Sequence, residues 1–426
     1  LGVILTGTAL LMLPAASVEN KVTPFIDALF TSTSATCVTG LIVVDTAKYF
    51  TIFGQVVILL LIQIGGLGIM TISTAFALIM GQRLTLKLEN VMHSMMGEAQ
   101  SFDIFALLRN IVLVTLIIES IGALVLYFSF VQVTEPLRAF YFAIFHSVSA
   151  FCNAGFSLYS QGLVPFIDNV NINLGITALI ILGGIGFAVI IDLYHYFTAR
   201  EKGKRLTLHT KMVLVTTAAL LIGGMIAYFI SEYNYSMRGF GVSRRLLASW
   251  FQSVTTRTAG FNTIDVSLLG SGSVLVSLIL MFIGASPGST GGGIKTTTFA
   301  VLILSVTSML RGRKDLTLMN RKISLSNARE ATSLVTLALS IVLLIVFMLM
   351  MTQHFSFEKI AFEAVSAFGT VGLSMGITAD LDAIGKLLIT LLMYIGRIGP
   401  LTLIYALSIS KRQGNVELAE EKIAIG

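Results

Sequence analysis

Four short segments of small, mostly uncharged residues recur along this chain, and their backbone could bind a ligand. They read FTSTSATCVTGL at 30–41, FHSVSAFCNAGFS at 145–157, FQSVTTRTAGFNT at 251–263 and FEAVSAFGTVGLS at 362–374. Each begins with Phe, and its run of small residues ends in a glycine, namely Gly40, Gly155, Gly260 or Gly372. Glycine permits the positive φ angles that aim carbonyl oxygens inward, and carbonyl oxygens at close range replace the water around a bare cation. These residues therefore predict cation binding by backbone.

The composition predicts a membrane protein around these segments. Of the 426 residues, 55% are hydrophobic and 12% are charged, and the mean hydropathy is +0.89, whereas soluble domains carry about 25% charged residues. Residues 50–82 and 266–294 contain no ionisable side chain. At about 1.5 Å per helical residue, either stretch can cross roughly 30 Å of hydrocarbon. The apolar runs are continuous rather than alternating, which predicts helices and not the strands of a barrel.

Other function classes lack a supporting pattern. The net charge of +6 comes from basic residues dispersed over short loops, so nucleic-acid binding is not predicted. Cys37 and Cys152 have no CxxC spacing, which predicts neither a metal site nor a disulfide. The sequence has no Ser/His/Asp set, paired carboxylates or HExxH motif, and His146 is expected to be packed, so catalysis is not predicted. The apolar run at Leu1 is expected to be a first span rather than a signal peptide.

The four segments mark a repeat that fills the chain. Their glycines lie 115, 105 and 112 residues apart, and such a period predicts one supersecondary unit per repeat. Each segment lies between two apolar runs, predicted as first helices at about 2–18, 110–131, 211–231 and 331–351, and second helices at about 52–80, 172–198, 272–310 and 385–410. Short pore helices are predicted at about 25–34, 138–150, 246–255 and 358–367.

The predicted fold is an all-α polytopic membrane protein with four consecutive helix, re-entrant pore loop, helix units around a pseudo-fourfold pore. Unit 1 spans residues 1–82, and unit 2 spans 83–199 with a preceding cytoplasmic loop. Unit 3 spans 200–314 and has a broken second helix, and unit 4 spans 315–426 with the C-terminal tail. The second helices share small-residue cores, IGGLGI at 64–69, LGGIGF at 182–187, IGASPGSTGGGI at 283–294 and IGRIGP at 395–400. Most of these small residues are interpreted as sites of close helix packing.

The distribution of basic residues predicts the orientation. The stretches between units and the tail carry 17 Lys and Arg residues, against eight in the loops within units. Positive charge favours the cytoplasmic side, so the C-terminus is expected in the cytoplasm, with the polar segments entering the cell membrane from outside.

Backbone without helical hydrogen bonds is tolerated at membrane depth only where it is buried in protein or lines water. We therefore expect the four segments to face one another around an axis, with the pore helices directing their negative dipole ends toward it. The predicted filter consists of Thr36, Cys37, Val38, Thr39, Gly40, Phe151, Cys152, Asn153, Ala154, Gly155, Thr256, Arg257, Thr258, Ala259, Gly260, Phe368, Gly369, Thr370, Val371 and Gly372.

The stretch IGASPGSTGGGIKTTT at 283–298 interrupts the third second helix. A kink at Pro287 is one interpretation, but ten consecutive small or flexible residues favour an intramembrane loop below the filter that blocks the path. The stretch nearly matches the motif of a phosphate-binding loop. The match fails because Ile294 separates Gly293 from Lys295 and no predicted strand precedes the stretch. The predicted gate comprises Gly284, Ala285, Ser286, Pro287, Gly288, Ser289, Thr290, Gly291, Gly292, Gly293, Lys295 and Arg397.

Charges inside apolar segments require an explanation. Arg397 lies in the last second helix, where a charge costs roughly 2.5 to 3.5 kcal/mol, so it is an electrostatic barrier below the filter or a partner of a buried acid. Arg257 stands within the third segment and is expected to face away from the pore, paired with Glu363 or Glu119. Asp27 is interpreted as a brace or part of the outer vestibule. Lys295 is expected to end the gate near cytoplasmic water.

These residues resemble the Trk/Ktr/HKT superfamily of potassium transporters, over the whole chain. The resemblance rests on TSATCVTGL, FCNAGFS, TTRTAGFNT and FGTVGLS, on the broken third helix and on the arginine of IGRIGPLT. It is greatest to the Ktr type of membrane subunit (KtrB type). The resemblance implies that one glycine per loop lines a potassium filter, that Gly40 favours potassium where serine would pass sodium, and that the 283–294 stretch is a gate loop.

The predicted function is channel-like potassium uptake across the cell (plasma) membrane by a multi-pass protein that is not an enzyme. A secondary carrier of monovalent cations with alternating access is the alternative, although carriers favour inverted repeats and midplane substrate sites. Potassium is the substrate, and no cofactor is expected on this chain. The resemblance further implies a homodimer, sodium-stimulated uptake and a cytoplasmic ring of nucleotide-binding regulatory subunits (KtrA-like). The basic loops 200–211 and 311–322 are candidate docking surfaces or simple determinants of topology, and the tail 415–426 could tie two chains together.

Overall fold

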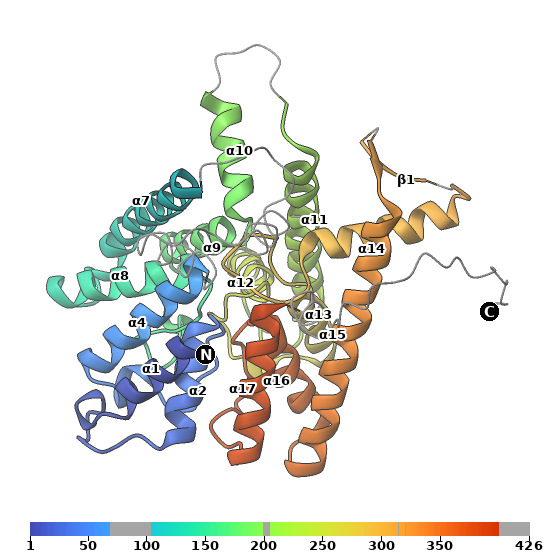
Figure 1. The fold of residues 1–426 in the computed structure, drawn as a ribbon. Helices are drawn as coiled ribbons and strands as arrows, with labels where there is room; N and C mark the ends of the chain where they lie inside the picture. The colour runs from blue at the N-terminus through green and yellow to red at the C-terminus, as the bar shows by residue number, and fades with distance from the viewer. Residues whose placement is uncertain (69–103, 199–204, 314, 320, 400–426) are drawn as a thin grey trace.

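The computed structural model describes residues 1–68, 104–198, 205–313, 315–319 and 321–399, and nearly all of its regular structure is helical. In Figure 1 the long helix α15 runs along one side of the molecule, α7 and α8 lie on the other, and α12 lies between them. Several predicted features lie outside the described residues. They are the parts of the predicted second helices at 69–80 and 400–410, the basic stretch 81–103, residues 200–204 of the 200–211 loop, and the tail 415–426.

The first helix of each predicted unit is α1 (Gly2–Met12), α7 (Ile104–Phe130), α11 (Leu208–Ser231) and α15 (Leu325–Thr352). By length and composition, three described helices can cross a membrane, or four if the bent pair of α9 and α10 counts as one span. The prediction of a first helix to residue 18 is wrong, because α1 ends at Met12. Leu13 is extended, at φ −61° and ψ 137°, before Pro14 opens a short 3₁₀ turn, Pro14–Ala16. A residue before proline is disfavoured in the helical region, which ends the helix.

The helices at the positions predicted for pore helices are α2 (Phe25–Thr36), α8 (Pro136–Phe151), α12 (Val242–Thr255) and α16 (Phe357–Gly369), close to the predicted bounds, and we keep that name for them. In each, the phenylalanine that opens the sequence motif is fully buried; these residues are Phe30, Phe145, Phe251 and Phe362. A buried aromatic ring contributes a large apolar area. The repeated Phe therefore anchors each of these helices in the protein interior.

Short elements connect the loops to the second helices: α3 (Thr46–Tyr49), η2 (Val164–Phe166) and η3 (Val266–Leu268). The second helices are α4 (Ile52–Leu67), α9 (Val170–Gly184) with α10 (Phe187–Thr198), α13 (Ser271–Phe282) with α14 (Thr296–Leu310), and α17 (Ala383–Ile398). Three of them begin with a side-chain cap, since Thr51, Asn169 and Asp382 each accept a hydrogen bond from a backbone N–H two or three residues on.

All four second helices end or bend at the small-residue core, whereas the sequence predicted a break in the third alone. The predicted continuous helix 172–198 is wrong, because α9 and α10 meet at 99°. Gly68, Gly186 and Gly399 stand at these ends with φ of 89°, 94° and 84°. A left-handed glycine cannot continue a right-handed helix, so the core that was interpreted as helix packing also terminates helices.

The basic stretch 311–322 contains a two-stranded antiparallel hairpin, β1 (Leu316–Leu318) and β2 (Arg321–Ile323), so the described chain is not wholly α-helical. Leu316 pairs with Ile323, and both side chains are buried. The hairpin follows α14 at the edge of the molecule (Figure 1).

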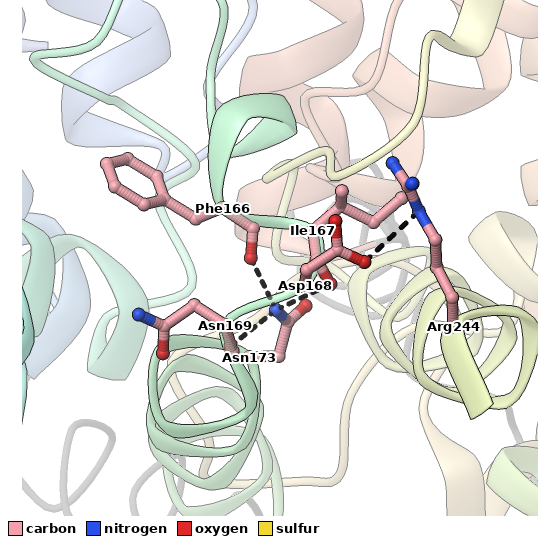
Figure 2. A network of polar contacts seen from close by, with 6 residues as sticks. All are labelled: Phe166, Ile167, Asp168, Asn169, Asn173 and Arg244. Carbon is pink, nitrogen blue, oxygen red and sulfur yellow. Dashed lines mark hydrogen bonds and ion pairs between the residues drawn. The ribbon is translucent and has the colours of Figure 1, made fainter.

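Polar contacts connect successive units outside the loops. Figure 2 shows Asp168, between η2 and α9, directed at Arg244 of α12, with 3.2 Å between Oδ1 and Nε. Behind it, the amide of the buried Asn173 lies within hydrogen-bonding distance of three backbone carbonyls of the turn before α9: Phe166 at 2.8 Å, Ile167 at 3.3 Å and Asn169 at 2.8 Å. The turn is thereby held in place for the ion pair.

A second ion pair joins the first and the last predicted unit. Asp27 of α2 lies 2.7 Å from Nζ of Lys386 in α17, and the two side chains are 20% and 15% exposed. The prediction of a brace at Asp27 is confirmed by this contact.

We expect Asp27→Asn to lower the free energy of unfolding by about 1–3 kcal/mol, between the values for surface and buried pairs, because it leaves the Lys386 ammonium without its partner. Thermal unfolding can be followed through the reactivity of the buried thiols Cys37 and Cys152. Glu19→Gln is the control, since the Glu19–Lys21 pair is 69% and 75% exposed. Equal unfolding temperatures for the two variants would contradict the brace.

Candidate functional site

The four motif glycines form a closed ring. A Cβ added to Gly40 would lie 2.4 Å from the Ala154 oxygen, one on Gly155 would lie 2.7 Å from the Ala259 oxygen, and one on Gly260 would lie 2.4 Å from the Val371 oxygen. The same atom on Gly372 would lie 2.1 Å from the Thr39 oxygen, which returns the sequence of contacts to the first loop. Each motif glycine therefore contacts the residue that precedes the motif glycine of the following unit. The glycine of the last unit contacts the first unit in the same way. No side chain fits at any of the four positions without displacing a neighbouring loop.

The four loops share one backbone pattern. In every five-residue filter segment, the third and fifth residues have positive φ; these are Val38, Asn153, Thr258 and Thr370 at 50° to 75°, and the four glycines at 70° to 91°. The other three residues of each segment have negative φ. Alternating right- and left-handed residues points successive peptide groups to one side of the chain, as in the concave backbone sites that bind ions.

Left-handed backbone outside glycine is strained. It costs roughly 1–2 kcal/mol per residue, and it is a marked outlier for branched side chains such as Val38 and Thr370. Such strain persists only where the surroundings enforce it, and it gathers at ligand sites. Four left-handed residues at one equivalent position therefore make these loops the candidate functional site.

Helical glycines support the loops from behind. Added Cβ atoms on Gly65, Gly183 and Gly396 would lie 2.1, 1.8 and 1.9 Å from the carbonyl oxygens of Thr36, Phe151 and Phe368, the first residues of loops 1, 2 and 4. This role is not predicted from the sequence, although the repeated small-residue core of the second helices is the signal that points to it. These glycines let the second helices approach the loops at backbone distance.

The interruption in the third second helix is a loop that closes on itself, not a kink. Ile283 and Ile294 pair as neighbours at its base, and the Ile294 N–H donates to the Phe282 carbonyl at 3.2 Å. The ten residues between them, 284–293, form the segment that we call the gate loop.

The gate loop lies directly against three filter loops. The Thr290 hydroxyl donates to the Phe151 carbonyl of loop 2 at 3.2 Å, and the Gly292 N–H donates to the Thr370 hydroxyl of loop 4 at 2.9 Å. A Cβ on Gly291 would lie 2.3 Å from Oγ1 of Thr258 in loop 3. In loops 3 and 4, the left-handed third position of the filter segment is thus also the position that meets the gate loop, whereas loop 2 meets it at its first residue.

Arg397 connects the gate loop to the remaining unit. Its Nη1 donates to the Thr290 carbonyl and its Nη2 to the Gly65 carbonyl at the end of α4. Among the described residues no carboxylate pairs with Arg397, so the alternative of a salt bridge to a buried acid is wrong there. Lys295, at the end of the gate loop, is half-buried and donates to the Gly291 carbonyl at 2.7 Å. Both cations therefore bind backbone oxygens of the gate loop.

The predicted pairing of Arg257 with Glu363 or Glu119 is wrong within the described chain. Arg257 is buried, and no ion pair joins it to either acid. Both acids accept other donors. Glu363 accepts from Thr378 and, at 2.8 Å, from Ser374; Glu119 accepts from Gln63 at 3.2 Å.

His146 is packed, as predicted. It is fully buried among aromatic rings, with Nδ1 2.7 Å from the Phe142 carbonyl and Nε2 3.0 Å from the Ser157 hydroxyl. Cys37 and Cys152 are buried and unpaired with each other.

Comparison with known proteins identifies similar sequences over almost the whole chain. Residues 3–418 match the family described as "TrkH: Cation transport protein". The chain is 40% identical to the Ktr system potassium uptake protein B of Bacillus subtilis (strain 168), covering 99% of this chain and 94% of that one. It is 38% identical to the protein of the same name from Vibrio alginolyticus (96% and 89% covered) and 39% identical to the potassium/sodium uptake protein NtpJ of Enterococcus hirae (99% and 94%).

Among solved structures, the crystal structure of the potassium transporter TrkH from Vibrio parahaemolyticus matches with a TM-score of 0.71, covering 95% of this chain and 84% of that one. At 19% identity, this similarity concerns the fold.

We expect Gly183→Ala to lower the free energy of unfolding by about 1–3 kcal/mol, because its Cβ meets the Phe151 carbonyl and the crowding must be relieved by backbone movement. Gly223→Ala is the matched control, since Gly223 lies in α11 with nothing within 4 Å of the added Cβ. That control should be neutral or stabilising by up to about 1 kcal/mol. Thermal unfolding in detergent measures both, and similar shifts would contradict the role assigned to Gly183.

Proposed function

We infer the function of this chain from one premise: it belongs to the TrkH family of cation transport proteins. It is a multi-pass membrane transporter and not an enzyme, and it is the membrane subunit of a Ktr-type potassium uptake system. We propose that potassium passes through the ring of filter loops as a channel-like flow. The single observation that carries this proposal is the cyclic contact of Gly40, Gly155, Gly260 and Gly372.

The ring suits a dehydrated monovalent cation. Four equivalent segments with the same alternation of φ supply backbone oxygens from four directions, which can replace the hydration shell of potassium. Each pore helix ends within or directly before its filter segment, so its negative dipole end adds to the attraction for a cation. No side-chain carboxylate is needed for such a site, and the filter segments contain none. The proposed filter residues are the twenty named from the sequence.

The gate loop is proposed to close the path on the other side of the ring. Its contacts with loops 2, 3 and 4, and its connection through Arg397 to α4, place it against every unit. Movement of residues 284–293 would therefore break contacts with all four units together. Two roles are proposed for Arg397. It holds the gate loop closed through the Thr290 carbonyl, and its charge opposes cations below the filter.

The arrangement around the pore is proposed from the same comparison and from the charge distribution. The four units are taken as residues 1–82, 83–199, 200–314 and 315–426, with the C-terminus in the cytoplasm. Since the relatives named above are proteins of the Ktr system, we extend the proposal to a homodimer with a nucleotide-binding regulatory ring (KtrA-like) on the cytoplasmic side. The nucleotide would bind the partner and not this chain.

Substitution of Gly40 tests the filter. We expect Gly40→Ser to lower the ratio of potassium to sodium flux about tenfold or more in reconstituted liposomes. The reason is that Gly40 has a φ of 91° and no room for a Cβ beside Ala154, so the ring must open. A tenfold change corresponds to about 1.4 kcal/mol of relative barrier. Gly239→Ser is the control, because Gly239 has a φ of 82° but open space around it. An unchanged flux ratio in Gly40→Ser would refute the filter.

Shortening the gate loop tests the gate. Removal of residues within 286–292 should raise potassium flux several-fold, because the loop then no longer reaches the filter loops or Arg397. Radiotracer uptake into liposomes measures the flux, and the thermal reactivity of Cys37 and Cys152 shows whether the shortened protein is folded. A folded protein that conducts less than the parent would show that this loop supports the path instead of blocking it.

A further inference from the structure

A hydroxyl group lies behind each filter glycine, four residues after the motif phenylalanine. These residues are Ser34, Ser149, Thr255 and Ser366, and all four are fully buried. The hydroxyl of Ser34 accepts from the Gly40 N–H at 3.1 Å and donates to the Leu41 carbonyl at 2.7 Å. Ser149 and Thr255 donate to the Phe156 and Phe261 carbonyls at 2.8 and 2.5 Å, and Ser366 accepts from the Gly372 N–H at 3.1 Å. One hydroxyl therefore holds each loop at or just after its glycine.

The bond to the glycine N–H controls the direction of the preceding carbonyl. In a planar trans peptide, the N–H and the C=O point in opposite directions. Since the Gly40 N–H points back to Ser34, the Thr39 carbonyl must point away from the pore helix. This agrees with the ring contacts, in which the Thr39 oxygen faces Gly372 and the Val371 oxygen faces Gly260.

The bond to the residue after the glycine has the opposite effect. The carbonyls of Leu41, Phe156 and Phe261 accept from the hydroxyls and are thus turned back toward the pore helix. At Gly40 and Gly372, where the glycine N–H is bonded to the hydroxyl, the preceding carbonyl points away from the pore helix. In loop 1, the Ser34 hydroxyl thus fixes the Thr39 carbonyl and the Leu41 carbonyl, one residue before and one residue after Gly40.

The same helices carry serines with a different role, two residues earlier. Ser32, Ser147 and Ser253 are also fully buried, and each donates to a carbonyl of a first helix: Ile4, Glu119 and Leu221, all at 2.7 Å. Their hydroxyls join the pore helix to its neighbour and form no hydrogen bond with a filter segment in the described chain; the Ser253 backbone carbonyl accepts from the Thr256 hydroxyl at 3.1 Å. The chain therefore contains two sets of buried hydroxyls that match in burial and bond length but differ in what they hold.

We propose that Ser34, Ser149, Thr255 and Ser366 are positioning residues for ion selection, which fix the last ring of filter carbonyls and set the outer end of the filter. They do not touch the ion, and they act through the glycine N–H, through the carbonyl of the residue after the glycine, or, for Ser34, through both. This inference rests on the proposed function, because it assumes that the ring of filter loops selects the ion.

The test compares the potassium to sodium flux ratio of Ser34→Ala and Ser32→Ala in liposomes containing the reconstituted protein. A ratio is independent of how much protein is recovered, so a modest loss of stability in both variants does not change it. We expect Ser34→Ala to lower the ratio about threefold or more, because it loses the bonds to the Gly40 N–H and the Leu41 carbonyl, and the loss of one hydrogen bond corresponds to roughly a three- to tenfold change. Ser32→Ala should leave the ratio within about twofold of the parent, although it loses an equally short bond.

The third unit supplies an independent pair should Ser34→Ala not be recovered. Thr255→Val keeps the shape of the side chain and removes the hydroxyl, and it should lower the ratio. Thr255→Ser keeps the hydroxyl and should restore the ratio, which a role in packing alone would not predict. Ser253→Ala is the control on the same helix.

Equal ratios in Ser34→Ala and Ser32→Ala, or in Thr255→Val and Thr255→Ser, would overturn the positioning role. Gly40→Ser, measured beside them, separates this result from a failure of the filter. If Gly40→Ser lowers the ratio and the hydroxyl variants do not, the filter stands and the positioning role is wrong. If Gly40→Ser also leaves the ratio unchanged, the filter assignment fails and the positioning role fails with it.

Discussion

The close approach of four backbones at Gly40, Gly155, Gly260 and Gly372 is the constraint from which the other features follow. Each glycine faces the carbonyl before the next at a distance that excludes a Cβ atom. Closing such a ring requires positive φ at the glycines and at the residue two before each of them. It also requires that nothing bulky lies behind the loops, which explains Gly65, Gly183 and Gly396 on the second helices. The repeated phenylalanines then anchor the four pore helices in the protein interior.

A ring made of backbone is costly in an apolar surrounding unless its polar groups have partners. The pore-helix hydroxyls and the gate loop are such partners in this chain, and Arg397 in turn binds the gate loop. Arg397 takes the position that Gly66, Gly184 and Ala285 occupy in the other units. From there its guanidinium reaches two carbonyls, which explains how a charge is tolerated at this depth without an acid. The groups that stabilise the ring are thus also those that could open or close the path beneath it.

The sequence predicted the parts of this arrangement that repeat. The motif glycines, the pore helices and the interruption after Ile283 could be read from it, because each shows as a pattern of residue types. It did not predict the bend at Gly186, since a glycine pair in an apolar helix also serves close packing. It could not predict left-handed Val38 and Thr370, because branched residues disfavour that region and only ring closure overrides the preference. The pairing expected of Arg257 was wrong because Glu363 and Glu119 find donors within their own surroundings. The partners of Arg397 are backbone carbonyls, which every residue type has, so the residue types do not predict them.

The most direct test of this account is to locate the ion. Crystals of the protein grown with rubidium or thallium in place of potassium would give an anomalous signal wherever the cation loses its water. The account predicts a peak on the axis enclosed by Gly40, Gly155, Gly260 and Gly372, and a much weaker peak at the same place in excess sodium. Cation density that avoids this ring and gathers instead beside acidic side chains would contradict it.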